Sequence, residues 1–265
     1  MVAMADSTAG RIGLLLRDWR QRRRLSQMEL ALEAGVSTRH LSFVETGRSR
    51  PSAEMVLHLA ERLEVPLRER NELLLAAGFA PQYPARSFDD PALHEIRDAV
   101  SRVLAAHEPY PAIAVDRHWN LIASNAALGP MLEGVAPDLL VPPVNTIRLA
   151  LHPDGVAPRI INLGEYRADL LGRLEREARL TGDAGLDELY AEMLGYPGPE
   201  APPPALAAAV TVQLRLAAPP GDDGGELAFF STITTFGTAV DVTVAELSVE
   251  AFFPADAHTA DRLRG

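Results

Sequence analysis

Four side chains near the N-terminus have the types and spacing needed to read base pairs of DNA. Counted from the first of them, they lie one, four and five residues apart, on one side of a helix: Thr38, Arg39, Ser42 and Phe43. Hydroxyl and guanidinium groups can hydrogen-bond the edges of bases, and an aromatic ring can contact a thymine methyl group. A helix that begins after Ser37 would present these side chains from its first turns. We therefore take them as candidate base contacts.

The local sequence predicts the helix-turn-helix that would position them. Ser26 followed by Glu29 forms a capping box, so a helix should start there and stop near Gly35. Ser37 is a second N-cap, and Gly47 should end the helix that follows it. Two short helices joined by a turn of three to four residues form a helix-turn-helix.

Three further helices should complete an all-α, five-helix domain over residues 1–80. Apolar residues recur at helical spacing before Arg23, which predicts a first helix. Ser52 caps a fourth helix that Pro66 breaks, and a fifth helix is predicted over 67–77. The candidate base contacts would thus lie in a compact helical head.

Residues 27–52 resemble the Cro/C1-type helix-turn-helix of the phage-repressor and xenobiotic-response-element families. The matching positions agree in order and spacing: Gln27, Leu30, Ala31, Gly35, Val36, Ser37, Leu41, Ser42, Val44, Glu45, Gly47, Arg48 and Pro51. The resemblance implies major-groove contacts from Thr38, Arg39 and Phe43. It implies DNA phosphate contacts, which set register but read no sequence, from a further set: Gln27, Ser37, Arg48 and Arg50.

A plain helical bundle with a solvated basic face is the alternative interpretation of this head. Arg22, Arg23 and Arg24 would suit solvent as well as they suit phosphate. Glu45 is expected to pair with a nearby arginine rather than to read a base.

The charge is distributed unevenly, as expected for a polyanion-binding head on an acidic body. The net charge is −11, yet residues 11–50 hold nine arginines against four acidic residues. The absence of lysine suits bidentate phosphate contacts and equally suits a GC-rich genome. The chain has no cysteine, no apolar run of ~20 residues and no recognisable secretory signal. We therefore expect a cytoplasmic protein with no disulfide, no thiolate metal site and no membrane partner.

A linker with a connecting helix is predicted over 81–107, and a mixed body over 108–265. Asp90 and Pro91 have the types that start a helix. Periodicity then predicts helices and strands in alternation: strands at 111–116 and 120–125, helices at 145–151, 159–180 and 186–194, and strands at 210–216, 227–236 and 242–253, with a turn at 219–226. Short turns between the last strands imply antiparallel pairing, so the fold class is α+β.

The body resembles the ligand-binding domain of MmyB-like regulators. The resemblance covers the chain after residue 90 in the same order, and three segments carry it: 109–127, 145–163 and 229–256. It implies a PAS-like domain with a five-stranded antiparallel sheet, helices on one side and an apolar cavity between them. It also implies a hydrophobic effector in that cavity, with a long-chain fatty acid as the expected class.

Apolar residues on the predicted strands are the candidate lining of that cavity: Ile113, Val115, Leu121, Phe229, Ile233, Phe236, Leu247 and Val249. Such residues more often form plain core, and alternation does not tell which strand face borders a cavity. A carboxylate ligand would need a buried positive or donor group, since an unpaired buried charge is costly. By position the nearest groups are Arg148, His152 and Arg159, each of which could equally form a surface ion pair or a cap.

The sequence is compatible with two functions. In the first, a homodimer binds double-stranded DNA at a two-fold operator, and a hydrophobic effector in the body modulates that binding. In the second, the body only dimerises or recruits a protein partner. An enzyme, a metal and a catalytic cofactor are not expected, because the seven histidines are scattered and no HExxH, GxSxG, P-loop or GxGxxG motif is present.

Overall fold

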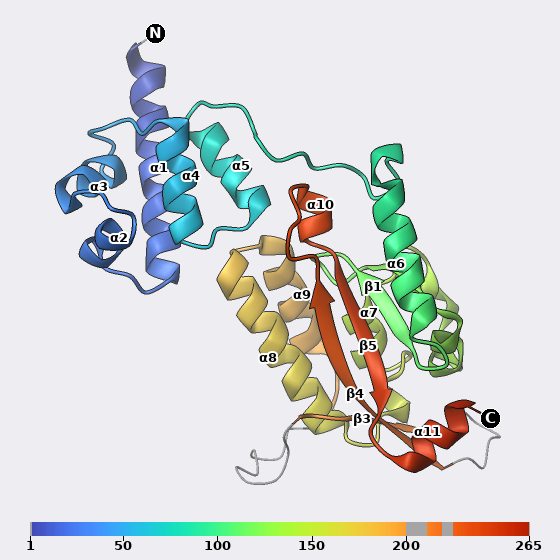
Figure 1. Ribbon diagram of the computed structural model, residues 1–265. Coiled ribbons are helices and arrows are strands. Elements are labelled where there is room, and N and C mark those ends of the chain that lie inside the picture. Colours follow the sequence, from blue (N-terminus) through green and yellow to red (C-terminus); the bar gives the residue numbers. More distant parts are fainter. Residues whose placement is uncertain (1, 200–210, 219–224, 265) are drawn as a thin grey trace. The chain divides into compact units, whose positions relative to one another are not determined.

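The chain divides into two compact units in the computed structural model, which describes residues 2–199, 211–218 and 225–264 (Figure 1). The first unit, here called the head, comprises residues 1–86 with the short segments 179–181 and 238–245. The second unit, here called the body, comprises the remaining residues. The head is built on helices, whereas the body holds a sheet and helices, so the predicted α+β class is confirmed.

The N-terminal segment of the head, residues 1–86, forms the five predicted helices: α1 (Val2–Arg22), α2 (Gln27–Glu33), α3 (Thr38–Glu45), α4 (Ala53–Arg62) and α5 (Leu67–Ala76). Three of them start where the sequence predicts a serine cap. The hydroxyl oxygens of Ser26, Ser37 and Ser52 each accept a backbone N–H from the residue three positions later. Glu29 accepts in turn from the Ser26 N–H, which completes the capping box.

The turn between α2 and α3 depends on a left-handed backbone conformation. Gly35 has a φ of +63°, where most side chains would be strained. The N–H of Val36 then donates to the carbonyl of Ala31 at 2.9 Å, which closes the end of α2. The turn lets Leu41 and Val44 of α3 enter the buried head core.

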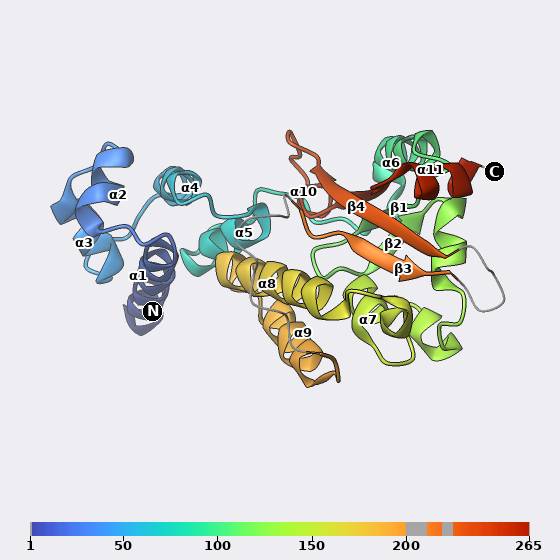
Figure 2. The same cartoon turned by 90° about the horizontal axis from the view of Figure 1, so that it is seen from below.

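A five-stranded antiparallel sheet lies at the centre of the body (Figure 2). Its strands are β1 (Ala112–Val115), β2 (Leu121–Ser124), β3 (Leu214–Ala217), β4 (Glu226–Thr235) and β5 (Ser248–Pro254), in the spatial order β2-β1-β5-β4-β3. The last three strands form the predicted meander. β1 joins it beside β5, where Ala114 is opposite Val249.

Helices cover both faces of the sheet, which corrects the expectation of helices on one side (Figure 2). One face carries α7 (Thr146–Leu151), α8 (Leu163–Thr181) and α9 (Ala184–Gly195). The other face carries α6 (His94–Ala106), which follows a 3-10 turn capped by Asp90. The second face is also apolar, through Ala112, Ala114, Leu247 and Val249, so it needs the cover that Val100 and Leu104 of α6 provide. Core packing thus accounts for much of the apolar stripe of α6.

The predicted strand over 242–253 is wrong in its first part. Residues Val242–Ala245 form a short helix, α10, and β5 begins only at Ser248. The Asp241 carboxylate accepts the N–H of Thr243 at 2.9 Å, so a local cap outweighs the strand preference of this valine-rich segment. The C-terminal helix α11 (Ala257–Arg264) follows β5 and packs against β4 and β5.

Two more boundaries in the body differ from prediction. The long helix starts at Leu163 rather than at 159, because the Ile161 N–H donates to the carbonyl of Arg215 at 2.8 Å and Ile160 forms a bridge to Leu216. β3 spans Leu214–Ala217, so it begins four residues later than the strand predicted over 210–216 and ends one residue later. Residue 210 and most of the predicted turn at 219–226 lie outside the described residues.

Candidate DNA-binding face and body cavity

The outer face of α3 carries all four candidate base contacts. The inner face is fixed by Leu41 and Val44, which are buried in the head core. Facing away from that core, Thr38 and Arg39 are exposed, and Ser42 and Phe43 are half-buried. The structure therefore brings the four residues together on one accessible surface, as a recognition helix requires.

Arg39 lies over the ring of Phe43 on this surface. The central guanidinium carbon is 5.3 Å from the ring centroid, within the range of a cation–π contact. The contact holds the guanidinium against the outer face of α3 instead of leaving it free in solvent. Phe43 can thus orient Arg39 for a base edge in addition to offering its own apolar surface.

The candidate phosphate contacts differ in whether their side chains already make hydrogen bonds within the protein. Ser37 is exposed, and its hydroxyl oxygen already accepts the His40 N–H at 3.1 Å. Arg50 donates to the carbonyl of Ala77 at 3.1 Å, which ties it to the end of α5. Arg48 is exposed and has no hydrogen-bond partner in the described part of the chain. Of these three side chains, Arg48 is the most available to a phosphate.

Gln27 is engaged inside the head, which the sequence analysis does not anticipate. Its side-chain amide donates to Oε2 of Glu45 at 2.8 Å. The amide nitrogen has a second N–H, which remains for a phosphate contact. Gln27 would therefore connect the DNA backbone to the buried carboxylate that it already holds.

Glu45 pairs with Arg20 of α1, as the sequence analysis expects of a structural carboxylate. Arg20 is also bonded to the carbonyl of Leu25 at 2.8 Å. The hydrogen bonds that Arg20 donates to the Glu45 carboxylate raise the pKa of the Arg20 guanidinium above its usual value. The pair connects α1 to α3, and because both side chains are buried they are not part of the outer face that carries the candidate base contacts.

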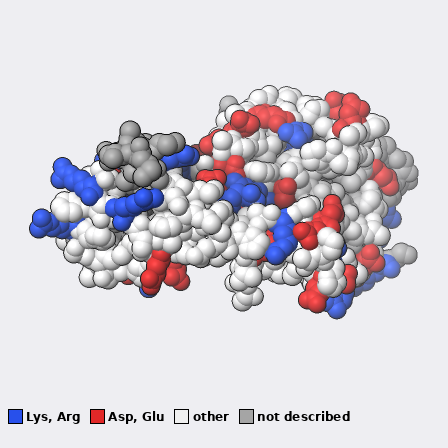
Figure 3. Space-filling model, turned by 90° about the horizontal axis from the view of Figure 1, so that it is seen from above, with Lys and Arg blue, Asp and Glu red and all other residues white. Residues whose placement is uncertain are grey.

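Arginine side chains stand out on the part of the surface that the head forms (Figure 3). On the face drawn there, acidic side chains are more frequent over the body than over the head. The uneven charge predicted from the sequence is thus visible at the surface. Phosphate groups would be attracted to the head and repelled by the body.

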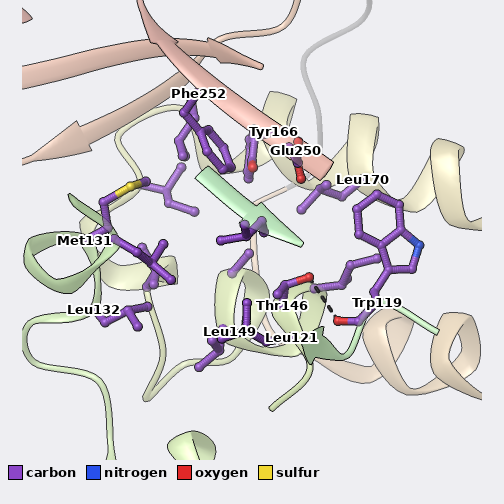
Figure 4. A pocket seen from close by; sticks show the side chains of 17 residues that line it. Trp119, Leu121, Met131, Leu132, Thr146, Leu149, Tyr166, Leu170, Glu250 and Phe252 are labelled. Atoms are coloured by element: carbon purple, nitrogen blue, oxygen red, sulfur yellow. Dashed lines mark hydrogen bonds between the residues drawn. The ribbon is translucent and has the colours of Figure 1, made fainter. Parts of the chain in front are cut away.

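A cavity of about 80 Å³ lies within the body, between the sheet and its helices (Figure 4). Fourteen of its seventeen lining residues are apolar, so its interior favours hydrocarbon over water. They come from β1, β2, β3, β5, α7, α8 and the 3-10 segment Ala126–Leu132. The cavity is smaller than the roughly 300–1,000 Å³ typical of ligand pockets. A long-chain ligand therefore needs lining side chains to move.

Three polar residues line the cavity: Thr146, Tyr166 and Glu250. The Thr146 hydroxyl donates to the carbonyl of Trp119 at 3.1 Å, so it is already satisfied (Figure 4). Burial, and then the nearby charge of Glu250, raises the pKa of the Tyr166 hydroxyl, which is therefore protonated at neutral pH.

Glu250 is a buried carboxylate tied to α8 and β4. Its Oε1 accepts from the Ser231 hydroxyl at 2.6 Å and lies 3.4 Å from Nη1 of Arg173. Arg173 also contacts Asp169 at 3.3 Å and lies over the Trp119 ring at 5.5 Å. Burial opposes the charge of Arg173, but Glu250 and Asp169 outweigh it and raise the pKa of the guanidinium.

The residues predicted to line the cavity do not all lie on the same face of the sheet, because successive side chains of a strand point to opposite faces. Ile113 and Leu121 line the cavity. Val115 and Phe229 are buried in the core on the same side but do not border it. The remaining four residues lie elsewhere: Phe236, Leu247 and Val249 pack on the α6 side, and Ile233 is 42% exposed.

None of the predicted ionic partners borders the cavity. Arg148 forms a bidentate pair with Glu192 at 2.7 Å, and His152 stacks edge-on against Tyr196. Arg159 donates to backbone carbonyls, including those of Met131 at 3.1 Å and Ala217 at 3.3 Å. The structure gives all three a local role in holding loops and helices.

Sequence reasoning missed Glu250 and Tyr166, although one signal was present. In β5 the apolar residues Val249 and Ala251 face α6, so Glu250 and Phe252 must face the opposite side. An acidic residue at an inward position of a buried strand marks a functional or tightly paired group. Tyr166 has no comparable signal, because its helical stripe is typical of core.

Comparison with known proteins agrees with both parts of this description. The family described as MmyB-like transcription regulator ligand binding domain matches residues 96–265, and a helix-turn-helix domain family matches residues 11–73. No curated protein compared with the chain matches it. Across the residues that the structure describes, no helix is long and apolar enough to span a membrane. The same residues contain no cluster of three metal-ligating side chains.

Proposed function

Since the chain belongs to the family of transcription regulators with an MmyB-like ligand-binding domain, we propose that a hydrophobic small molecule bound in its body modulates how its head binds DNA. The helix-turn-helix match over 11–73 makes the chain a DNA-binding regulator. The outer face of α3 is proposed to read the operator through Thr38, Arg39, Ser42 and Phe43.

The observation that carries this proposal is the apolar cavity of the body. Its walls belong to the sheet and to helices on one face, so a bound molecule would contact several elements at once. A ligand that fits one arrangement of those elements better than another shifts the population between them. A long-chain fatty acid is the class that the family resemblance suggests.

A homodimer would use such a shift at a two-fold operator. Two α3 helices must lie in successive major grooves, about 34 Å apart or a multiple of that distance. A change in their spacing or mobility alters operator affinity, and coupling of this kind is typically about 5–150-fold.

The test is operator affinity with and without ligand. An operator is first selected from random duplex DNA with the full-length protein. The dissociation constant is then measured by fluorescence anisotropy across a panel of fatty acids and of alcohols, amines and alkanes with the same chain lengths. The proposal expects one member to raise the melting temperature and to change operator affinity by at least about fivefold. Sedimentation of the complex gives its stoichiometry, which should be two chains per operator.

A body without a small-molecule effector is the second candidate, and the small volume of the cavity favours it. In that case the body only dimerises or recruits a protein partner. The same panel separates the two, because no hydrophobic compound would then change either the melting temperature or operator affinity.

A further inference from the structure

Two of the three polar residues that line the body cavity lie at one end of it, beside α8, whereas Thr146 lies apart from them on α7. Figure 4 shows Tyr166 and Glu250 next to each other there, among otherwise apolar side chains. Glu250 is 6% exposed, so its carboxylate is shielded from bulk water. Burying a charged group costs free energy unless hydrogen bonds and an opposite charge stabilise it.

Only one of the two carboxylate oxygens of Glu250 accepts hydrogen bonds from described residues. Oε1 receives both the Ser231 hydroxyl and the Arg173 guanidinium, while Oε2 accepts no hydrogen bond from the part of the chain that the structure describes. The Tyr166 hydroxyl likewise makes no hydrogen bond to any described residue. A free acceptor and a free hydroxyl therefore border the same apolar space.

The balance of charge at this end is negative. Arg173 is the counter-ion of Glu250, but it is shared with Asp169, so two carboxylates face one guanidinium. Arg159, the other arginine close to lining residues, directs its donors to backbone carbonyls. A ligand carboxylate placed here would meet the charge of Glu250 with no arginine or histidine among the lining residues to offset it.

Building on the proposed ligand-binding role of this cavity, we infer that it selects an amphiphile whose head group donates a hydrogen bond and carries no negative charge, with Oε2 of Glu250 as the acceptor. An alcohol and an ammonium ion share this chemistry. The Tyr166 hydroxyl is the second anchor and accepts from, or donates to, the same head group. The hydrocarbon tail occupies the apolar remainder of the cavity.

Four eight-carbon probes test the inference: octane, octanol, octylamine and octanoate, below their micelle concentrations at pH 7. Calorimetric titration of the full-length protein gives each dissociation constant. Trp119 lines the cavity and the chain has two tryptophans, so its fluorescence in a Trp19→Phe variant shows that the probe enters there. Octanol and octylamine should bind about ten- to a hundredfold more tightly than octanoate, because hydrogen bonds to charged groups are strong.

Two substitutions assign the preference to its residues. Glu250→Gln keeps an acceptor but removes the charge, so octylamine should bind at least about tenfold more weakly, octanoate more tightly, and octanol nearly as before. Tyr166→Phe keeps the ring and removes the hydroxyl, so octanol should weaken while octane does not change. A melting curve of each variant shows whether it is folded. If Glu250→Gln does not fold, Tyr166→Phe alone tests the head-group preference.

The outcomes separate this inference from the proposed function. If no probe binds, octane included, the cavity is not a ligand site and the proposed function fails with the inference. If all four probes bind with similar affinity, or octanoate binds best, the cavity is a ligand site but the head-group preference is wrong. An unchanged probe order in Glu250→Gln also overturns the role of Glu250.

Discussion

Arg20 and Glu45 form a bidentate ion pair inside the head, with Nε–Oε1 at 2.7 Å and Nη2–Oε2 at 2.8 Å. The Glu45 side chain is 1% exposed, and Gln27 donates to the same carboxylate. One buried charge thus joins α1, α2 and α3. The placement of the candidate base contacts on α3 depends on this ion pair, although Arg20 and Glu45 are both buried.

Glu45→Ala should destabilise the head by about 3–5 kcal/mol, because it leaves the Arg20 guanidinium buried without its partner. Urea unfolding followed by Trp19 fluorescence in a Trp119→Phe background measures this transition in the full-length chain. Glu33→Ala is the matched control, since Glu33 is exposed on α2 and should change stability by no more than about 0.5 kcal/mol. Equal effects of the two substitutions would show that the ion pair contributes nothing specific.

Gly13 marks a close approach between α1 and α3. A Cβ added there would lie 2.7 Å from the carbonyl oxygen of Glu45, whereas one added at Gly10 would meet nothing within 4 Å. Gly13→Ala should therefore cost about 1–3 kcal/mol, while Gly10→Ala in the same helix should be neutral or stabilising by up to about 1 kcal/mol. Thermal unfolding of the two variants compares them directly, and a stable Gly13→Ala protein would contradict this packing.

Local signals explain why the head could be predicted so fully. Ser26, Ser37 and Ser52 act on N–H groups three residues away, and Gly35 acts within one turn, so neighbouring residues contain the information. The partner of Glu45 could be foreseen only as some arginine. Which arginine it is depends on how α1 packs against α3, and local sequence patterns do not predict this packing.

In the body, contacts between residues far apart in the sequence set helix boundaries and cavity-facing positions that periodicity does not predict. The start of α8 is delayed because Ile161 bonds Arg215, more than fifty residues away. The alternation in β5 was visible, but which face borders the cavity depends on the placement of α6 and α8. For that reason the sequence predicts Val249 as a lining residue, whereas its neighbour Glu250 is the one that lines the cavity.

Arg48→Ala should weaken binding to all DNA sequences by the same factor, because a phosphate contact carries no sequence information. The slope of log affinity against log salt should decrease by about 1. Anisotropy titrations over a range of salt concentrations, on the operator and on an unrelated duplex, give both quantities. An effect confined to the operator would identify Arg48 as a base contact instead.

Ala150→Phe should block the body cavity, since Ala150 lines it and a ring would occupy the space available to a ligand. The variant should lose the ligand-induced rise in melting temperature and the ligand effect on operator affinity. Its affinity for the operator without ligand should be within about twofold of the wild type, because the head is unchanged. A ligand effect that persists in this variant would place the ligand outside the cavity.

The central claim is that the outer face of α3 reads base pairs, and Arg39→Ala tests it most directly. Operator and single-base-pair variants of it are titrated with wild-type protein, with Arg39→Ala and with Arg62→Ala, which removes an exposed arginine at the end of α4. We expect Arg39→Ala to lose about 1–3 kcal/mol on the operator and to discriminate less at one base pair, while Arg62→Ala behaves as the wild type. Unchanged affinity and discrimination in Arg39→Ala would remove α3 from the groove and contradict the account.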